Sequence, residues 1–238
     1  MGIKERQERE REAIRRAILD AARDLFVRDG YQHVSIRKIA ERIEYSPAAI
    51  YGYFPSKDDI FYALAEEGFQ LLYGDRASYT PHDSVPPLDR IRATFMRLYE
   101  YSREHPQYFA LMFVDRSVPR ISREYERFAS ARELKDYLIA EVRKCMTSGV
   151  FRADLQPEVA LRLLMTGILG VAVMRLSERL APNENADDLA RDVLDITIAG
   201  LQSGIPLRSQ SSRLCPDEDA AESRSGAGAE SLPTGAVS

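Results

Sequence analysis

Apolar side chains near the N-terminus recur every three to four residues, which is the period of an amphipathic helix. Glycine is the usual residue where a helix ends in a left-handed conformation, and this run stops at Gly30. The pattern therefore predicts a first helix that closes there. Its apolar positions are Ile14, Ile18, Ala21, Ala22, Leu25 and Phe26.

Two shorter helices with a tight turn between them are predicted from Ser35 to about Tyr53. Ser35 is placed to cap the first, because a serine hydroxyl accepts a hydrogen bond from the backbone N–H groups at a helix start. The apolar period breaks at residues 44–46, and Ser46-Pro47 then puts a capping residue before a proline suited to the first helical turn. The predicted inner faces consist of Ile36, Ile39, Ala40, Ile43, Ile50 and Phe54.

The rest of the chain is predicted to be helical too, and no segment shows the signals of a β-strand or hairpin. A fourth helix should start at Ser56 and run to about Tyr79, ahead of a proline-rich break at Thr80–Pro87. Later helices are expected at about 88–104, 106–115, 119–147 and 157–180, with a last one ending near Ser203.

These elements predict an all-α fold in four parts. Residues 1–11 are a charged N-terminal extension, and residues 12–57 form a three-helix domain with the layout of a DNA-reading helix-turn-helix. Residues 58–205 form a larger helical domain. Residues 206–238 hold few large apolar groups, so we expect a disordered tail.

Composition and charge permit DNA binding. The 238 residues carry a net charge of −4, but the segment from His33 to Lys57 is positive and the tail is negative. Because salt screens each surface charge within about 10 Å, a positive patch binds phosphates even on an acidic protein. No run approaches the roughly 18 apolar residues that a membrane span needs, and the N-terminus lacks the apolar core of a secretory signal. Two cysteines make no disulfide framework, so we expect a cytoplasmic protein without a membrane partner.

The stretch AILDAARDLFVRDGYQHVSIRKIAERIEYSPAAIYGYFPSKDDIF resembles the N-terminal DNA-binding domain of the TetR (tetracycline-repressor) family over roughly residues 12–60. The resemblance rests on Gly30-Tyr31, on Ser35, and on Ile50-Tyr51-x-Tyr53-Phe54-x-Ser56-Lys57. Beyond about residue 65 only the general helical layout is similar. The resemblance implies a homodimeric transcriptional regulator, by family default a repressor, which a small and largely apolar effector releases from a palindromic operator in double-stranded DNA.

The residue types and the resemblance together predict a DNA-contacting face. Arg37 is the candidate for a bidentate contact to guanine, because its guanidinium has the matching donor geometry. Small residues on the exposed side of the recognition helix allow close approach to base edges. By resemblance, Ser35, Tyr51, Tyr53 and Lys57 bind phosphates, although Tyr51 could instead pack between helices. The predicted contacts are Ser35, Arg37, Pro47, Ala48, Ala49, Tyr51, Gly52, Tyr53 and Lys57.

The N-terminal extension has two interpretations. Its cations could follow a DNA groove or an adjacent phosphate. Ion pairs between residues four apart on a helix explain the same alternation, and this second interpretation is the one we favour. The cations are Lys4, Arg6, Arg9, Arg11, Arg15 and Arg16, and the acids are Glu5, Glu8, Glu10 and Glu12.

The larger domain is expected to dimerise and to bind the effector. Segment 157–180 mixes small and apolar residues around most of its circumference, and Gly167 and Gly170 permit close helix approach. With the last helix it has the pattern of a subunit interface in which two helices from each chain form a four-helix bundle. Aromatic and methionine side chains in the middle segments suit an adaptable apolar cavity. By the family layout, the candidate ligand-binding residues are Tyr99, Phe109, Phe113 and Tyr137.

Other functions remain open. Cys145, with Arg143 and Lys144 beside it, could act as a redox switch, and the input could be a protein partner instead of a metabolite. An all-helical di-iron enzyme would need Glu-x-x-His pairs, and none of His33, His82 and His105 has a glutamate three positions before it. No phosphate-binding or nucleophile motif occurs either. We therefore expect no catalytic residues, no metal site and no cofactor.

Overall fold

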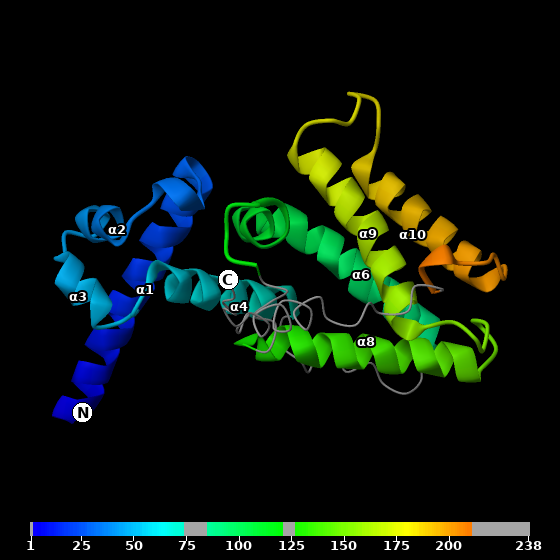
Figure 1. The fold of residues 1–238 in the computed structure, drawn as a ribbon, viewed down its shortest axis with the longest axis horizontal. Helices are drawn as coiled ribbons and strands as arrows, with labels where there is room; N and C mark the ends of the chain where they lie inside the picture. The colour runs from blue at the N-terminus through cyan, green and yellow to red at the C-terminus, as the bar shows by residue number, and fades with distance from the viewer. Residues whose placement is uncertain (1, 74–84, 121–126, 211–238) are drawn as a thin grey trace, which may run out of the picture. The chain divides into compact units, whose positions relative to one another are not determined.

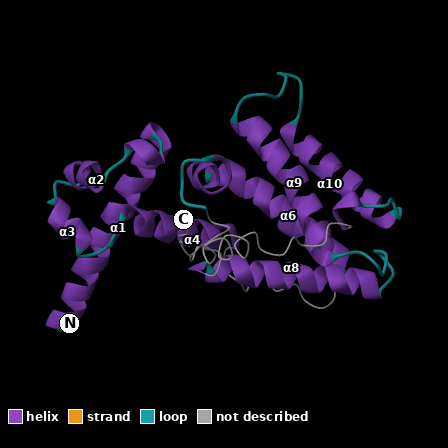
Figure 2. Cartoon of the chain, viewed as in Figure 1, coloured by secondary structure: helices purple, strands orange, loops and turns teal. Residues whose placement is uncertain are grey.

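The computed structural model describes residues 2–73, 85–120 and 127–210, and within these ranges every regular element is helical (Figures 1 and 2). The predicted all-α fold is confirmed. Met1–Gly204 form one compact unit, and the chain from Ile205 forms a second. The helices of the first unit are α1 (Ile3–Asp29), α2 (Ile36–Arg42), α3 (Pro47–Tyr51), α4 (Lys57–Tyr73), α6 (Pro87–Glu104), α7 (Pro106–Phe109), α8 (Ala129–Thr147), α9 (Pro157–Leu176) and α10 (Ala186–Gln202), with short helical turns at Tyr31–His33 and Ala110–Val114.

Helix α1 begins at Ile3, so the N-terminal extension is its first turns. Ion pairs join neighbouring turns there, since Arg6 Nε lies 2.9 Å from Glu10 Oε1 and Arg15 Nη1 lies 3.5 Å from Glu12 Oε1. The helix closes as predicted at Gly30, whose φ of 79° lies in the left-handed region. The predicted apolar positions Ile18 to Phe26 are buried.

Both predicted serine caps of the helix-turn-helix are present. The Ser35 hydroxyl accepts a hydrogen bond from Lys38 N at 3.3 Å, and Ser46 accepts one from Ala49 N at 3.2 Å. Since these caps satisfy N–H groups that a short helix leaves without partners, they stabilise helices of only seven and five residues. The turn between the helices places Glu44 at φ 59°, a left-handed conformation that its residue type does not predict.

Helix α4 starts after Ser56, whose hydroxyl accepts from Asp59 N at 3.1 Å as expected. Its predicted continuation to Tyr79 lies outside the described residues, as do most of the proline-rich break and residues 211–238 of the tail.

The prediction of one helix over 119–147 is wrong at its start. Pro119 and Arg120 are not helical, and α8 begins only at Ala129. The preceding Phe128 is buried at φ −100°, ψ 87°, and its ring lies 5.5 Å from that of Phe69 on α4. This packing accompanies the non-helical backbone of Phe128, the residue immediately before α8. Segment 106–115 is also divided, into α7 and a π-helical turn at Ala110–Val114.

Helix α6 packs against α8, α9 and α10, and α9 and α10 lie side by side (Figure 1). Between α6 and α8 the core encloses an ion pair. Arg90 Nε and Nη2 lie 2.7 and 2.6 Å from Glu141 Oε2, and both side chains are almost wholly buried. The exposed side chain of Lys144 also pairs with Glu141: its Nζ lies 2.8 Å from the other carboxylate oxygen.

Helix α9 corrects the prediction that no segment approaches a membrane span. The helix has 20 residues, and an 18-residue window within it has a mean hydropathy of 1.8, enough for a span by length and composition. Arg162 and Thr166 interrupt the apolar run, but the leucine, isoleucine, valine and methionine around them keep the average high. One such helix is weak evidence for a membrane, because core and interface helices share its composition.

Candidate nucleic-acid interface

The face that α3 presents to solvent agrees with most of the prediction. Pro47, Ala48 and Gly52 are exposed, while Ile50 is fully buried. Ala49 was expected on the exposed side but is half-buried, because it lies at the edge of α3 immediately before the inward-facing Ile50. The result is a surface of small groups without a bulky side chain over the helix start.

Arg37 stands exposed on α2, one residue after the first helical position. Its Nε donates to Glu41 Oε1 at 2.9 Å, which is an ion pair between residues four apart. This contact uses Nε, so the two terminal nitrogens of the guanidinium stay available for a planar acceptor pair. Glu41 thus orients the group that we predicted to read guanine.

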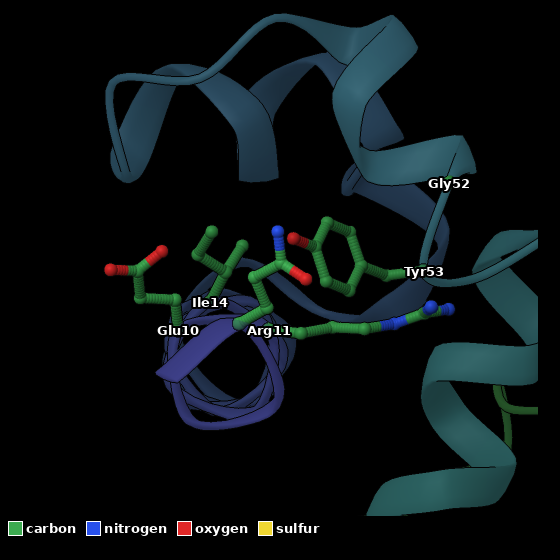
Figure 3. A pocket seen from close by; sticks show the side chains of 6 residues that line it. Glu10, Arg11, Ile14, Gly52 and Tyr53 are labelled. Carbon is green, nitrogen blue, oxygen red and sulfur yellow. The ribbon is translucent and has the colours of Figure 1, made fainter. Parts of the chain in front are cut away.

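The two tyrosines have different surroundings. Tyr51 is 56% exposed, so its ring does not pack between helices, which removes the alternative that the sequence left open. Tyr53 is half-buried and lies beside α1, with Arg11 Cζ 5.8 Å from its ring centroid (Figure 3). Both rings remain within the segment where α3 ends and the turn to α4 begins.

Lys57 lies at the start of α4 and reaches back toward α2. Its Nζ donates to Tyr31 O at 2.9 Å and to Val34 O at 3.0 Å, and it lies 4.0 Å from the centroid of the Tyr31 ring. Burial lowers the pKa of this ammonium group. The contact brings Lys57 next to Ser35, so two predicted phosphate-binding residues gather at the N-terminus of α2. An ammonium has three N–H donors, and the two carbonyls use two of them.

We predict that Lys57→Met weakens both the fold and DNA binding. Two carbonyls lose a charged donor, which costs about 1–3 kcal/mol of unfolding free energy. The remaining donor is expected to bind a phosphate, so the salt dependence of DNA binding should fall by about one counterion. Thermal melts and titrations at several salt concentrations measure the two effects.

Lys38→Met is the matched control, because Lys38 also donates to a carbonyl, that of His33 at 2.8 Å. If Lys57→Met lowers the melting temperature but leaves the same salt dependence as Lys38→Met, Lys57 is a structural clamp and not a phosphate ligand.

The four predicted ligand-binding residues have different surroundings, and none of them lines either of the two hollows along α1 that are described below. Phe109 and Phe113 stack with ring centroids 5.2 Å apart, and Phe109 is fully buried. Tyr99 is buried and instead donates to Asp187 Oδ1 at 2.7 Å. Tyr137 is half-buried, and its pKa is raised by burial and by Glu141. Their role in binding a ligand stays a prediction.

Two surface hollows lie along α1. One, of about 380 Å³, opens between α1 and the end of α3 (Figure 3), and is lined by Gln7, Glu10, Arg11, Ile14, Gly52 and Tyr53. The other lies on acidic turns of α1, at Glu5, Glu8, Arg9 and Glu12. Over the part of the chain that the structure describes, no three His, Cys, Asp or Glu side chains are grouped to hold a metal ion.

Family models match both halves of the chain. Residues 18–64 match the model described as bacterial regulatory proteins, tetR family, and residues 91–197 match the tetracyclin repressor-like C-terminal domain. The chain belongs to the TetR family. The first match covers the capped helices α2 and α3, and the second runs from within α6 into α10.

Named relatives of this TetR-family chain include nucleoid occlusion factor SlmA of Sodalis glossinidius, 34% identical over 162 residues that cover 65% of this chain and 78% of that protein. The HTH-type transcriptional regulator YdeS of Bacillus subtilis is 28% identical over 81% of this chain and 91% of its own length. The crystal structure of PfmR from Thermus thermophilus has the same fold, with a TM-score of 0.58 at 24% identity over 77% of this chain and 98% of that one.

Coverage is smaller for two further relatives. The chain spans 59% of the length of SlmA from Mannheimia succiniciproducens and 32% of an HTH-type transcriptional repressor of Mycobacterium tuberculosis.

Proposed function

We propose that this protein is a DNA-binding transcriptional regulator, a repressor in its default action, that a small and largely apolar effector releases from a palindromic operator. The observation that carries the proposal is the exposed face of α2 and α3, where Arg37 and Tyr51 project from two capped helices beside the small residues of α3. Such a face suits the major groove, since an α-helix fits there and small side chains let it approach the bases.

The proposed contacts divide into two kinds. Arg37 and the α3 residues Pro47, Ala48, Ala49 and Gly52 read bases. Ser35, Tyr51, Tyr53 and Lys57 hold the sugar-phosphate backbone and so set the register of the helix in the groove. The proposed DNA-binding domain comprises residues 12–57, and residues 58–205 bind the effector and form the dimer.

Arg37→Ala tests the proposed function. Full-length protein is first used to select duplexes from a random-sequence library, and we expect an inverted repeat. On that duplex Arg37→Ala should weaken binding by about 10- to 100-fold, because a bidentate arginine–guanine contact contributes about 1–3 kcal/mol of discrimination. On a scrambled duplex the loss should be much smaller. Fluorescence anisotropy measures both.

Arg42→Ala serves as the control, since Arg42 is an exposed cation on the same helix. If the two variants lose the same affinity on both duplexes, Arg37 contributes only its positive charge and does not read a base. Failure of the wild-type chain to select any duplex would contradict DNA binding itself.

A homodimer is supported by the exposed side of α9 and α10. Only 33% of the apolar stretch of α9 is buried within one chain. Met165 and Met174 on α9 are about two-fifths exposed, and Ile196 on α10 is 71% exposed. Large apolar side chains exposed on two adjacent helices favour a protein partner, and a second copy of this chain would present the same helices. The space beside Gly167 is already filled by Val193 of α10. A Cβ at Gly170 would meet nothing within 4 Å, which leaves room there for a partner helix.

Coupling between the proposed domains is supported by Glu67 on α4. Its Oε1 lies 2.6 Å from Arg16 Nη1 on α1 and accepts a hydrogen bond from the Tyr108 hydroxyl on α7 at 2.7 Å. The next residue, Gly68, has no room for a side chain because a Cβ would overlap Met112 Sδ. A movement of α7 would therefore reach α1 and α4 together, and an effector that favours one arrangement would shift the population between the two.

A protein partner is the alternative to a small-molecule effector. Regulation through oxidation of Cys145 is less well supported. The Cys145 side chain is fully buried. Burial is the main cause that raises the pKa of its thiol to about 11. A reactive cysteine needs an accessible thiolate, so this one is better suited to filling the core.

A further inference from the structure

The first turns of α1 carry cations that the proposed DNA contacts do not use. Arg6 pairs with Glu10, Arg15 with Glu12 and Arg16 with Asp20. Lys4 and Arg11 are exposed, and among the described residues neither has a carboxylate within ion-pairing distance. The ion pairs that we expected from the sequence therefore account for only part of this charge.

Lys4 and Arg11 share one face of α1. They are seven residues apart, and seven residues make almost two full turns of an α-helix. Arg15, four residues further on, continues the same face, and its guanidinium lies 5.3 Å from the ring centroid of Phe54. We refer to Lys4, Arg11 and Arg15 as the α1 stripe. Glu10, by contrast, points away from the Tyr53 ring (Figure 3).

The stripe is continuous with the proposed DNA-binding face. Arg11 extends beneath the ring of Tyr53, and the hollow between them is bounded by Gly52 at the end of α3 (Figure 3). A guanidinium that stacks on an aromatic ring keeps its N–H donors free in the plane of the group. Arg11 is thus held beside a predicted phosphate ligand with its donors available.

We propose that the α1 stripe is a second, sequence-independent DNA contact, in which Arg11 and Lys4 bind backbone phosphates next to the recognition helix. The proposal rests on the proposed function. It assigns the N-terminal turns of α1 a role in affinity and leaves base reading to α2 and α3. Phosphate contacts set affinity and its salt dependence without discriminating between sequences.

Arg11→Gln should weaken binding about fivefold at about 0.15 M salt, because each phosphate contact releases close to one counterion. The double variant Lys4→Gln/Arg11→Gln should lose about 25-fold under the same relation. The slope of log affinity against log salt should fall by about one and about two. Anisotropy titrations use the full chain on two duplexes of equal length, one selected by the wild-type protein and one scrambled, and the fold-loss should be the same on both.

Arg9→Gln is the matched control, because it removes the same charge from the same helix on the opposite side, about 160° from Arg11. Its surroundings, Glu5, Glu8 and Glu12, are acidic. Equal affinity and slope for Arg11→Gln and Arg9→Gln would overturn the α1 stripe while leaving the proposed function intact, since the wild-type chain still binds. A loss confined to the selected duplex would overturn the phosphate assignment. Absence of wild-type binding to any duplex would overturn both proposals.

Discussion

Replacing Glu141 by leucine is expected to lower the unfolding free energy by about 3–5 kcal/mol, because it leaves Arg90 charged and buried without its partner. Arg90 and Glu141 are 6% and 3% exposed at the side chain, so water cannot compensate for the lost contact. For a chain of this size the melting temperature should fall on the order of 10 °C. Differential scanning calorimetry of the full chain measures the change.

The double variant Arg90→Met/Glu141→Leu should recover most of that loss, since a well-packed apolar pair commonly replaces a buried ion pair at little cost. Glu104→Leu is the surface control. Glu104 pairs with Arg97 at 2.5 Å but is 52% exposed, and such pairs contribute at most about 1 kcal/mol. If Glu141→Leu destabilises no more than Glu104→Leu, the buried pair does not hold α6 to α8.

Ile196→Glu is expected to convert the proposed dimer into monomers. Ile196 is 71% exposed in one chain, so the substitution should leave the fold of a single chain intact. In a dimer the new carboxylate would be buried without a partner, which is strongly unfavourable. A monomer engages one half-site at a time, so affinity for an inverted repeat should drop by about 10²- to 10⁴-fold. Sedimentation velocity gives the oligomeric state, and anisotropy gives the affinity.

Two further variants sharpen this result. Gly170→Leu adds a side chain where the single chain has open space, so it should also dissociate the dimer without unfolding the chain. Val114→Glu places the same charge on another exposed apolar residue, 40% exposed and outside α9 and α10, and should change neither property. A stable dimer in both Ile196→Glu and Gly170→Leu would rule out this face as the interface.

Local sequence signals anticipated the DNA-binding region well. Ser35, Ser46 and Gly30 act at helix ends, where one residue decides the backbone geometry, and each has the role that its residue type predicts. The start of α8 was missed because it depends on Phe128 packing against Phe69, a contact between residues far apart in the chain. Such a contact leaves no periodic trace in the sequence.

The sequence by itself determined the all-α fold, the capped recognition unit and the family resemblance, because these follow from residues close together along the chain. Only the tertiary structure decided how individual charges are used. In the structure Lys57 donates to two backbone carbonyls and Glu141 pairs with Arg90, whereas Arg11 stacks on Tyr53 and has no carboxylate partner among the described residues. In the sequence alone, nothing distinguishes these side chains from the other charged residues of the chain. Their energies depend on burial and on partners up to about fifty residues away, which only folding brings together.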